Sequence, residues 1–164
     1  MPRLDPEAAA EVLARAEPIP TERPAVQAPR GLSGVDLSGS SLSVPLDRPT
    51  VVLFVATGCD GCDELVALVR AGVDGFQVVG VLRPSTHEPE EARRAFTGTG
   101  GTWLVGDEPF EALQVRSAPF FSVVVDGAVV CEGVGFGAAH LLGHLDRIRA
   151  GSPAPDLRRL DPRR

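Results

Sequence analysis

Two cysteines separated by two residues, Cys59 and Cys62, are the residues of this sequence best suited to covalent chemistry. They follow the apolar run Val51–Ala56, which is rich in β-branched residues and predicts a strand buried on both faces of a mostly parallel sheet. Apolar residues recur with helical spacing from Leu65 to Val69, so we expect a helix to begin at the cysteines. A thiol at a helix N-terminus ionises more easily, and a second cysteine one turn later can displace it from a mixed disulfide. The pattern therefore predicts thiol–disulfide exchange.

Two other interpretations of the cysteine pair stay open on spacing alone: half of a zinc site, and two inert core thiols. Zinc needs two further ligands, and the candidates are His87, His140, His144 and Cys131. His140 and His144 are four residues apart and could chelate from one helix, but that helix closes the domain, so we expect it to lie far from Cys59. Three cysteines in a chain of 164 residues also argue against a framework of paired disulfides.

Length and composition predict one globular domain of ordinary size. The 164 residues are 43% hydrophobic and 23% charged, close to the norm for globular proteins. Prolines crowd both ends of the chain. We therefore expect a Pro-rich segment over 1–30 with a short helix from Asp5 to about Glu17, a folded domain over 31–149, and a flexible tail over 150–164. The formal net charge of −6 argues against nucleic-acid binding, which needs a basic face.

Apolar runs in this sequence are short. None approaches the roughly 18 residues that a membrane span needs. The N-terminus also lacks the apolar stretch of a secretory signal. We therefore expect the chain as written to be cytoplasmic, and to be extracytoplasmic if an export signal or an anchor has been removed.

Alternating strand and helix patterns predict an α/β sandwich. After the first strand, a second buried strand is expected at Phe76–Leu82 and a third at Trp103–Val105. Asp126-Gly127 between two apolar runs indicates a β-hairpin, because this pair readily adopts the positive φ angles of a tight turn. The other expected elements are helical segments at Glu88–Phe96 and Glu108–Leu113, hairpin strands at Phe120–Val125 and Ala128–Val134, and a closing helix at Ala138–Arg149.

Several blocks of the sequence, taken in order, resemble a known family. One block is Arg48–Cys62, with an Arg-Pro pair, an apolar strand, Ala-Thr and the cysteine pair. Another is the turn Val115–Pro119, followed by the hairpin, a glycine and the last helix, and residues 31–46 look like a two-stranded opening. In these blocks the chain resembles thioredoxin-like thiol–disulfide oxidoreductases, in the branch related to peroxiredoxins and to the reductases of cytochrome c maturation. The resemblance covers residues 31–149. It implies a thioredoxin fold, with a central mixed β-sheet flanked by helices and a short N-terminal β extension.

The resemblance also implies a role for each site residue. It makes Cys59 the thiol that attacks a substrate disulfide and Cys62 the thiol that resolves the mixed disulfide. Pro119 is expected to be a cis-proline facing the pair, with Ala118 offering backbone groups to an extended substrate strand. The implied substrate-binding residues are Gly58, Asp60, Gly61, Ala118 and Pro119. The implied partners are a protein or small-molecule disulfide and an unidentified electron donor; no organic cofactor and no metal is implied.

Two departures from the family pattern bear on the chemistry. Leu53 stands where many thioredoxins carry a buried acid, so fast general-base catalysis is in doubt. Gly58 stands where they carry an aromatic residue, which leaves a more open rim. In addition, the acids Asp60, Asp63 and Glu64 surround the pair and oppose a thiolate by Coulomb repulsion. Because a destabilised thiolate favours the disulfide form, we expect a reducing couple.

Two rival functions stay open. The first is a thioredoxin-fold binding or redox-switch module that does not turn over. The second is peroxidase chemistry, which the resemblance to peroxiredoxins suggests. The sequence disfavours it, because the P-x-x-x-T-x-x-C arrangement of peroxiredoxins is absent and Thr57 stands only two residues before Cys59.

Away from the pair, the remaining conspicuous residues are interpreted as structural. Cys131 is expected to be a small buried hydrophobe, with a regulatory or intermolecular thiol as the alternative. Trp103 is expected to pack in the core or at its edge, and His87 to be an exposed turn residue. The aromatic residues expected in the core are Phe120, Phe121 and Phe136.

Overall fold

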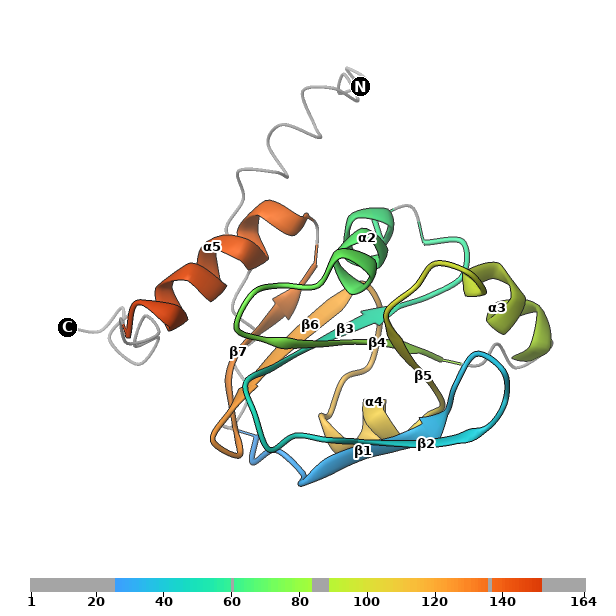
Figure 1. The fold of residues 1–164 in the computed structure, drawn as a ribbon, viewed down its shortest axis with the longest axis horizontal. Helices are drawn as coiled ribbons and strands as arrows, with labels where there is room; N and C mark the ends of the chain where they lie inside the picture. Colours follow the sequence, from blue (N-terminus) through green and yellow to red (C-terminus); the bar gives the residue numbers. More distant parts are fainter. Residues whose placement is uncertain (1–25, 60, 84–88, 136, 152–164) are drawn as a thin grey trace, which may run out of the picture.

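The computed structural model describes residues 26–59, 61–83, 89–135 and 137–151. Within these ranges the chain forms one seven-stranded sheet with helices on both faces (Figure 1). The helix expected from Asp5 and the tail after residue 151 lie outside the described residues, as do Asp60, His87 and Phe136. The division of the chain at residues 30 and 150 stays a prediction.

The sheet is mixed, with the strand order β2-β1-β5-β4-β3-β6-β7. Strands β3, β4 and β5 are parallel, β6 joins β3 in the antiparallel sense, and β7 pairs with β6. The β1–β2 hairpin is the expected N-terminal extension, and it attaches to β5 where Val35 pairs with Val105. The strands are β1 Gly31–Val35, β2 Ser41–Pro45, β3 Thr50–Val55, β4 Gln77–Leu82, β5 Thr102–Val105, β6 Phe120–Val125 and β7 Ala128–Val134.

The central strand β3 is buried along its whole length, as its continuous apolar run predicts. Its alternate residues face two separate cores, one on each side of the sheet. Its last residue, Val55, pairs with Leu82 of β4, and Phe54 pairs with Phe120 of β6. The segments that follow β3 and β4, and the segment that precedes β6, therefore meet at one edge of the sheet.

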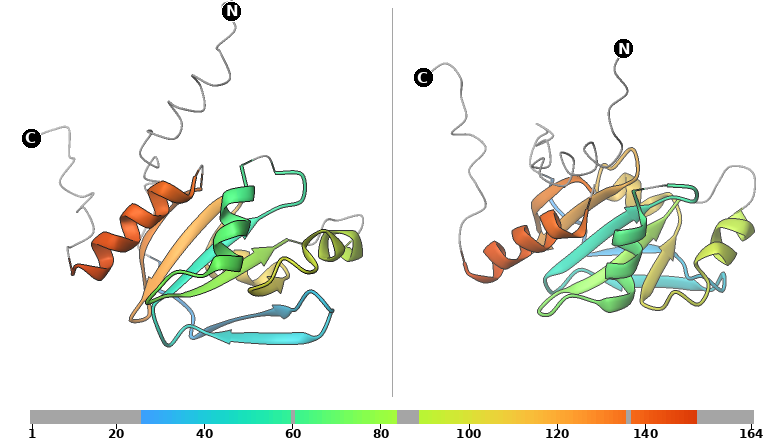
Figure 2. Two further views of the ribbon diagram at one scale, coloured as in Figure 1. Left: turned by 45° about the horizontal axis from the view of Figure 1, so that its top comes forward. Right: turned by 90° about the horizontal axis from the view of Figure 1, so that it is seen from above.

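Helices cover the two faces of the sheet unequally (Figures 1 and 2). On one face α2 (Asp63–Ala71) and α5 (Ala138–Arg149) bury their apolar sides, and α3 (Pro89–Phe96) adds Phe96 to the same core. On the other face α4 (Glu108–Ala112) contributes Phe110. Among the described residues, no helix is long and apolar enough to cross a membrane.

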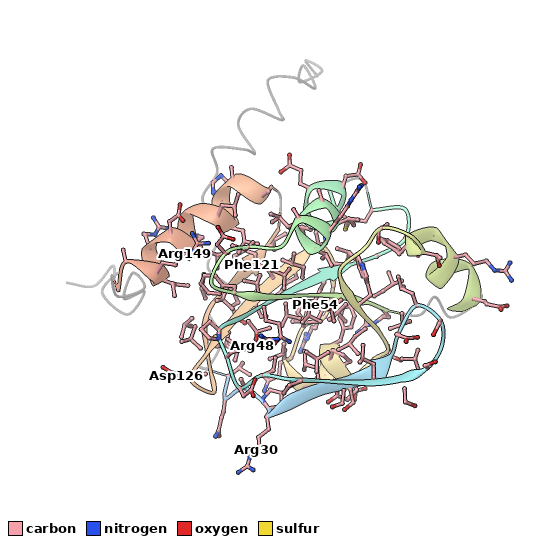
Figure 3. All side chains as sticks on the ribbon, viewed as in Figure 1. Arg30, Arg48, Phe54, Phe121, Asp126 and Arg149 are labelled. Atoms are coloured by element: carbon pink, nitrogen blue, oxygen red, sulfur yellow. A yellow bond between two sulfur atoms is a disulfide. The ribbon has the colours of Figure 1, made fainter. Side chains whose placement is uncertain are left out.

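Two local details follow from short-range hydrogen bonding and backbone angles. Asp126 and Gly127 have φ of 50° and 76°, so the β6–β7 hairpin turns through two residues with positive φ, as the Asp-Gly pair predicts. Figure 3 shows Asp126 at the outer end of this hairpin.

Strand β4 begins at Gln77 and not at Phe76, because the N–H of Phe76 donates to the carbonyl oxygen of Val73 (3.1 Å) in a tight turn.

Candidate active site

Cys59 and Cys62 form a disulfide at the carboxyl end of β3, with their Cα atoms 5.4 Å apart. Gly58, with φ of 70°, turns the chain after the strand, and glycine adopts this angle without the steric cost that other residues have. The N–H of Cys62 then donates to the carbonyl oxygen of Cys59 (3.2 Å), which closes a short turn. The disulfide therefore spans a turn between the central strand and α2.

The helix starts later than the sequence analysis expected. Cys62 is the N-cap residue of α2, and the first hydrogen bond of the helical pattern runs from the N–H of Val66 to the carbonyl oxygen of Cys62 (2.9 Å). Cys59 thus lies in the turn ahead of the helix and not on its first turn, because the chain needs the Gly58 bend and the Cys59–Cys62 turn before it can become helical. Both cysteines still lie at the N-terminal, positive end of the α2 dipole.

The two cysteines differ in exposure. Cys62 is only 2% exposed and belongs to the core between the sheet and the helices α2 and α5. Cys59 is partly exposed and packs at the edge of the same core. The resemblance thus assigns attack to the more accessible cysteine and resolution to the buried one.

Pro119 lies against the cysteine turn. The Ala118–Pro119 peptide bond is cis, as the resemblance implied. A Cβ atom placed on Gly61 would lie 3.6 Å from Cγ of Pro119, which puts the proline ring in van der Waals range of the turn. The carbonyl oxygen of Pro119 accepts a hydrogen bond from the N–H of Gly135 (3.2 Å). Ala118 and Pro119 are both half-buried, so this segment forms one wall beside the disulfide.

The two departures from the family pattern have clear structural consequences. Leu53 is fully buried within the core on the α2 side, so an apolar side chain stands where the resemblance places an acid. Gly58 is exposed, and a Cβ atom placed on it would meet nothing within 4 Å. The rim beside Cys59 is therefore open, as expected.

The acids near the pair are arranged differently from the expectation. Oε2 of Glu64 accepts a hydrogen bond from the N–H of Ala138 (2.6 Å), so this carboxylate faces the positive N-terminus of α5. That contact offsets part of its charge, and Glu64 opposes a thiolate less than the sequence analysis assumed. Asp63 is exposed and lines a shallow hollow of about 400 Å³ with Val66 and Arg70. Asp60 lies outside the described residues.

One residue at the carboxyl end of β4 has no role among the expectations drawn from the sequence. Arg83, the residue directly after β4, pairs with Asp107, lies over the ring of Phe110 and donates to the carbonyl oxygen of Arg116. Arg116 belongs to the loop that leads to Pro119. The available signal was the position of Arg83, because residues that follow neighbouring parallel strands emerge at the same edge of a sheet.

The other candidate ligands and thiols lie elsewhere. Cys131 in β7 is half-buried, less buried than expected, and burial raises the pKa of its thiol to about 11. His140 and His144 lie on α5, as expected, and Nδ1 of His144 is 2.7 Å from Nη2 of Arg147. Within the described ranges, no group of three or more His, Cys, Asp and Glu side chains could hold a metal ion. Trp103 is 3% exposed, which confirms its packing role.

No protein-family model matches the sequence, and no curated protein matches it. Solved structures do match. A candidate thioredoxin from Neisseria meningitidis is 24% identical, with a TM-score of 0.60 over 80% of this chain and 95% of that one. A thiol:disulfide interchange protein from Bacteroides sp. is 18% identical, with a TM-score of 0.57 over 83% of this chain and 96% of that one.

A third match is a secreted disulfide oxidoreductase of Mycobacterium tuberculosis homologous to E. coli DsbE. It is 19% identical, with a TM-score of 0.54 over 70% of this chain and 93% of that one. At these identities the matches establish the fold, which is thioredoxin-like with an added N-terminal β-hairpin.

Proposed function

We propose that the protein is a thiol–disulfide oxidoreductase that uses Cys59 and Cys62. The observation that carries the proposal is the Cys59–Cys62 disulfide itself, with one cysteine partly exposed and the other buried, next to Pro119 at the carboxyl end of β3. Such a pair can undergo exchange by attack from its accessible member and release by its buried one. The thioredoxin-like fold of the matched structures supports the same assignment.

The reaction conserves atoms and electrons in two displacement steps. In the reduced protein, the Cys59 thiolate attacks one sulfur of a substrate disulfide, forms a mixed disulfide and releases the other substrate sulfur as a thiolate, which takes a proton from solvent. Cys62 then loses its proton and attacks the Cys59 sulfur, which closes the Cys59–Cys62 disulfide and releases the second substrate thiolate. The substrate gains two electrons and the pair loses two, and a dithiol electron donor restores the pair.

Leu53 has a consequence for the second step. A leucine cannot accept the proton of Cys62, so we propose that solvent or the departing thiolate takes it. Because Cys62 is buried, this proton transfer is expected to limit the rate of resolution.

The direction we propose is disulfide reduction. Asp60 lies between the two cysteines in the sequence and Asp63 follows Cys62, and both acids disfavour a thiolate. A couple whose reduced form lacks stabilisation is a weak oxidant. Glu64 supports this direction less than its position in the sequence implies, because its carboxylate faces α5. Protein or small-molecule disulfides are the proposed substrates. The compartment, cytoplasmic as written or extracytoplasmic if a signal or anchor has been removed, stays a prediction.

Two assays, performed one after the other, test the function and its direction. The first measures reduction of insulin by dithiothreitol: the wild type should accelerate it, Cys59→Ser should not, and Cys131→Ala should behave as the wild type. Equal rates for the wild type and Cys59→Ser would exclude catalysis by the pair and favour a binding or redox-switch module. The second equilibrates the pair in redox buffers, and a potential more negative than that of glutathione would assign reductase direction.

A further inference from the structure

Arg83 occupies a specific position beside the site. It directly follows β4, and because Leu82 pairs with Val55, it lies at the edge of the sheet from which the cysteine turn emerges. Its side chain is 43% exposed. An exposed arginine needs no partner for its charge, so its contacts with protein groups call for an explanation.

The guanidinium of Arg83 makes three contacts with two other segments. Its Nε lies 3.2 Å from Oδ1 of Asp107, and its Cζ lies 4.2 Å from the ring centroid of Phe110. These two partners hold it against α4. The third contact is with the loop after α4: Nη1 donates to the carbonyl oxygen of Arg116 at 3.3 Å.

That third contact lies within the loop Val115–Pro119, which ends at the wall beside the disulfide. At the start of the loop, the N–H of Val115 donates to the carbonyl oxygen of Phe110 (2.8 Å). At its end, the carbonyl oxygen of Pro119 accepts from Gly135. Between these anchors Arg83 supplies a side-chain hydrogen bond, and its charge makes that bond stronger than a neutral one.

The Phe110 ring beneath the Arg83 guanidinium belongs to a group of packed aromatic rings. The ring centroid of Phe110 lies 4.8 Å from that of Phe54 in β3. The ring centroid of Phe54 lies 6.4 Å from that of Phe120. Phe120 directly follows Pro119. Arg83 therefore links a packed aromatic group, which includes Phe54 of β3, to the backbone of the exposed loop.

We propose that Arg83 is a positioning residue for substrate docking, which holds the loop Val115–Pro119 at a fixed distance from Cys59. The proposal rests on the proposed function, since it assigns this loop the role of a substrate wall. Its contacts are with Asp107, Phe110 and Arg116, so removing it should alter docking and leave the sulfur chemistry unchanged.

The chain offers a matched control. Arg149 also pairs with an aspartate, Asp146 (3.0 Å), and also lies over a phenylalanine ring, that of Phe76 (5.6 Å). It stands at the last turn of α5, and Phe76 precedes β4, so this arginine belongs to the opposite edge of the sheet (Figure 3). Arg149→Met thus removes an ion pair and a ring contact of the same kinds without touching the loop.

The experiment compares steady-state kinetics of Arg83→Met and Arg149→Met with the wild type. For Arg83→Met the KM for insulin should rise about tenfold while kcat stays within about twofold, because the lost contact positions only the loop assigned to substrate binding. The reduction potential should equal that of the wild type, and Arg83→Lys should recover part of the KM. Arg149→Met should match the wild type in all three quantities.

Hydrogen exchange separates this proposal from the proposed function. In Arg83→Met the amides of Val115 and Gly135, which donate hydrogen bonds at the two ends of the loop (2.8 and 3.2 Å), should exchange about tenfold faster than in the wild type, because loss of the Arg83 contact lets the loop open more often. Equal exchange rates and an equal KM in Arg83→Met and Arg149→Met would overturn the proposal. A wild type without turnover would overturn the proposed function, while the exchange rates still decide whether Arg83 holds the loop.

Discussion

The carboxylate of Glu64, in the first turn of α2, accepts a hydrogen bond from the N–H of Ala138, the first residue of α5 (2.6 Å). The two residues are 74 positions apart in the chain. The first amides of a helix have no partner within it, and a carboxylate there both accepts a hydrogen bond and faces the positive end of the dipole. Glu64, two residues after Cys62, thus joins α2 to α5, which both pack on the same face of the sheet.

Removing this link should destabilise the protein. Glu64→Ala should lower the free energy of unfolding by about 1 kcal/mol, the usual cost of losing a carboxylate or hydroxyl cap. Glu64→Gln should lose less, because its amide oxygen still accepts the hydrogen bond. Urea denaturation measures both, with Asp63→Ala as the control, since it removes a neighbouring acid from the same helix turn. Equal losses for Glu64→Ala and Asp63→Ala would show that the contact with α5 contributes nothing.

The difference in exposure between the two cysteines predicts which variant traps a substrate. In a Cys131→Ala background, Cys62→Ser should accumulate a mixed disulfide, because the partly exposed Cys59 can attack and nothing can release the product. Cys59→Ser should trap at least about tenfold less, because the remaining thiol is buried. Non-reducing gels followed by mass spectrometry measure the trapped species, with the double serine variant as blank. Equal trapping by the two single variants would contradict the division of roles.

Gly80 in β4 is required by the ring of Trp103 in β5. A Cβ atom on Gly80 would lie 2.6 Å from two ring carbons of Trp103. The ring cannot easily move, since its Nε1 donates to the carbonyl oxygen of Gly100 (2.8 Å) and Phe96 packs against it at 5.1 Å between centroids. Gly80→Ala should therefore lower the free energy of unfolding by about 1–3 kcal/mol, the usual cost of overpacking.

The chain contains one tryptophan, so fluorescence during urea denaturation reports on this site directly. The control is Gly143→Ala in α5, where an added Cβ meets nothing within 4 Å. That change should raise the free energy of unfolding by about 0.5–1 kcal/mol, because alanine favours the helix. Stabilisation by both changes would show that the Trp103 ring adapts without cost.

The thiol of Cys131 should ionise only at high pH. Burial raises the pKa of its thiol to about 11, while Arg147 lowers it and Glu132 raises it to a smaller degree. In the oxidised protein Cys131 is the free thiol, and the sequence contains no tyrosine to mask thiolate absorbance near 240 nm. The folded protein should therefore show one absorbance step near pH 11, which Cys131→Ala should lack. A step near pH 9 would mean that Cys131 is open to water.

The same pKa predicts how stability depends on pH. Below about pH 9 the Cys131 thiol is protonated in both the folded and the unfolded chain, so it adds no pH dependence. Between about pH 9 and pH 11 the unfolded chain loses this proton and the folded chain keeps it, which favours unfolding as the pH rises. The oxidised wild type should lose on the order of 2 kcal/mol across this window relative to Cys131→Ala, measured by thermal unfolding. Parallel pH profiles would contradict this.

Features that depend on neighbouring residues could be predicted from the sequence. The apolar run Val51–Ala56 predicts β3 because a strand buried on both faces needs apolar residues at every position. Asp126-Gly127 predicts the hairpin because positive φ is a property of those two residues. The cysteine pair after a strand and before a helix predicts the disulfide, because a turn over three residues can bring the two Cα atoms within disulfide range, here 5.4 Å.

Contacts between groups distant in sequence arise only in the folded chain. The acids after Cys62 looked equivalent in the sequence, but Glu64 faces the amide of Ala138 from across the molecule, which changes its effect on the pair. Arg83 reaches Arg116 because two parallel strands and α4 bring residues 33 positions apart to one edge of the sheet. No local pattern specifies such contacts, since they depend on the packing of whole elements, and the electrostatics of the site depend on them.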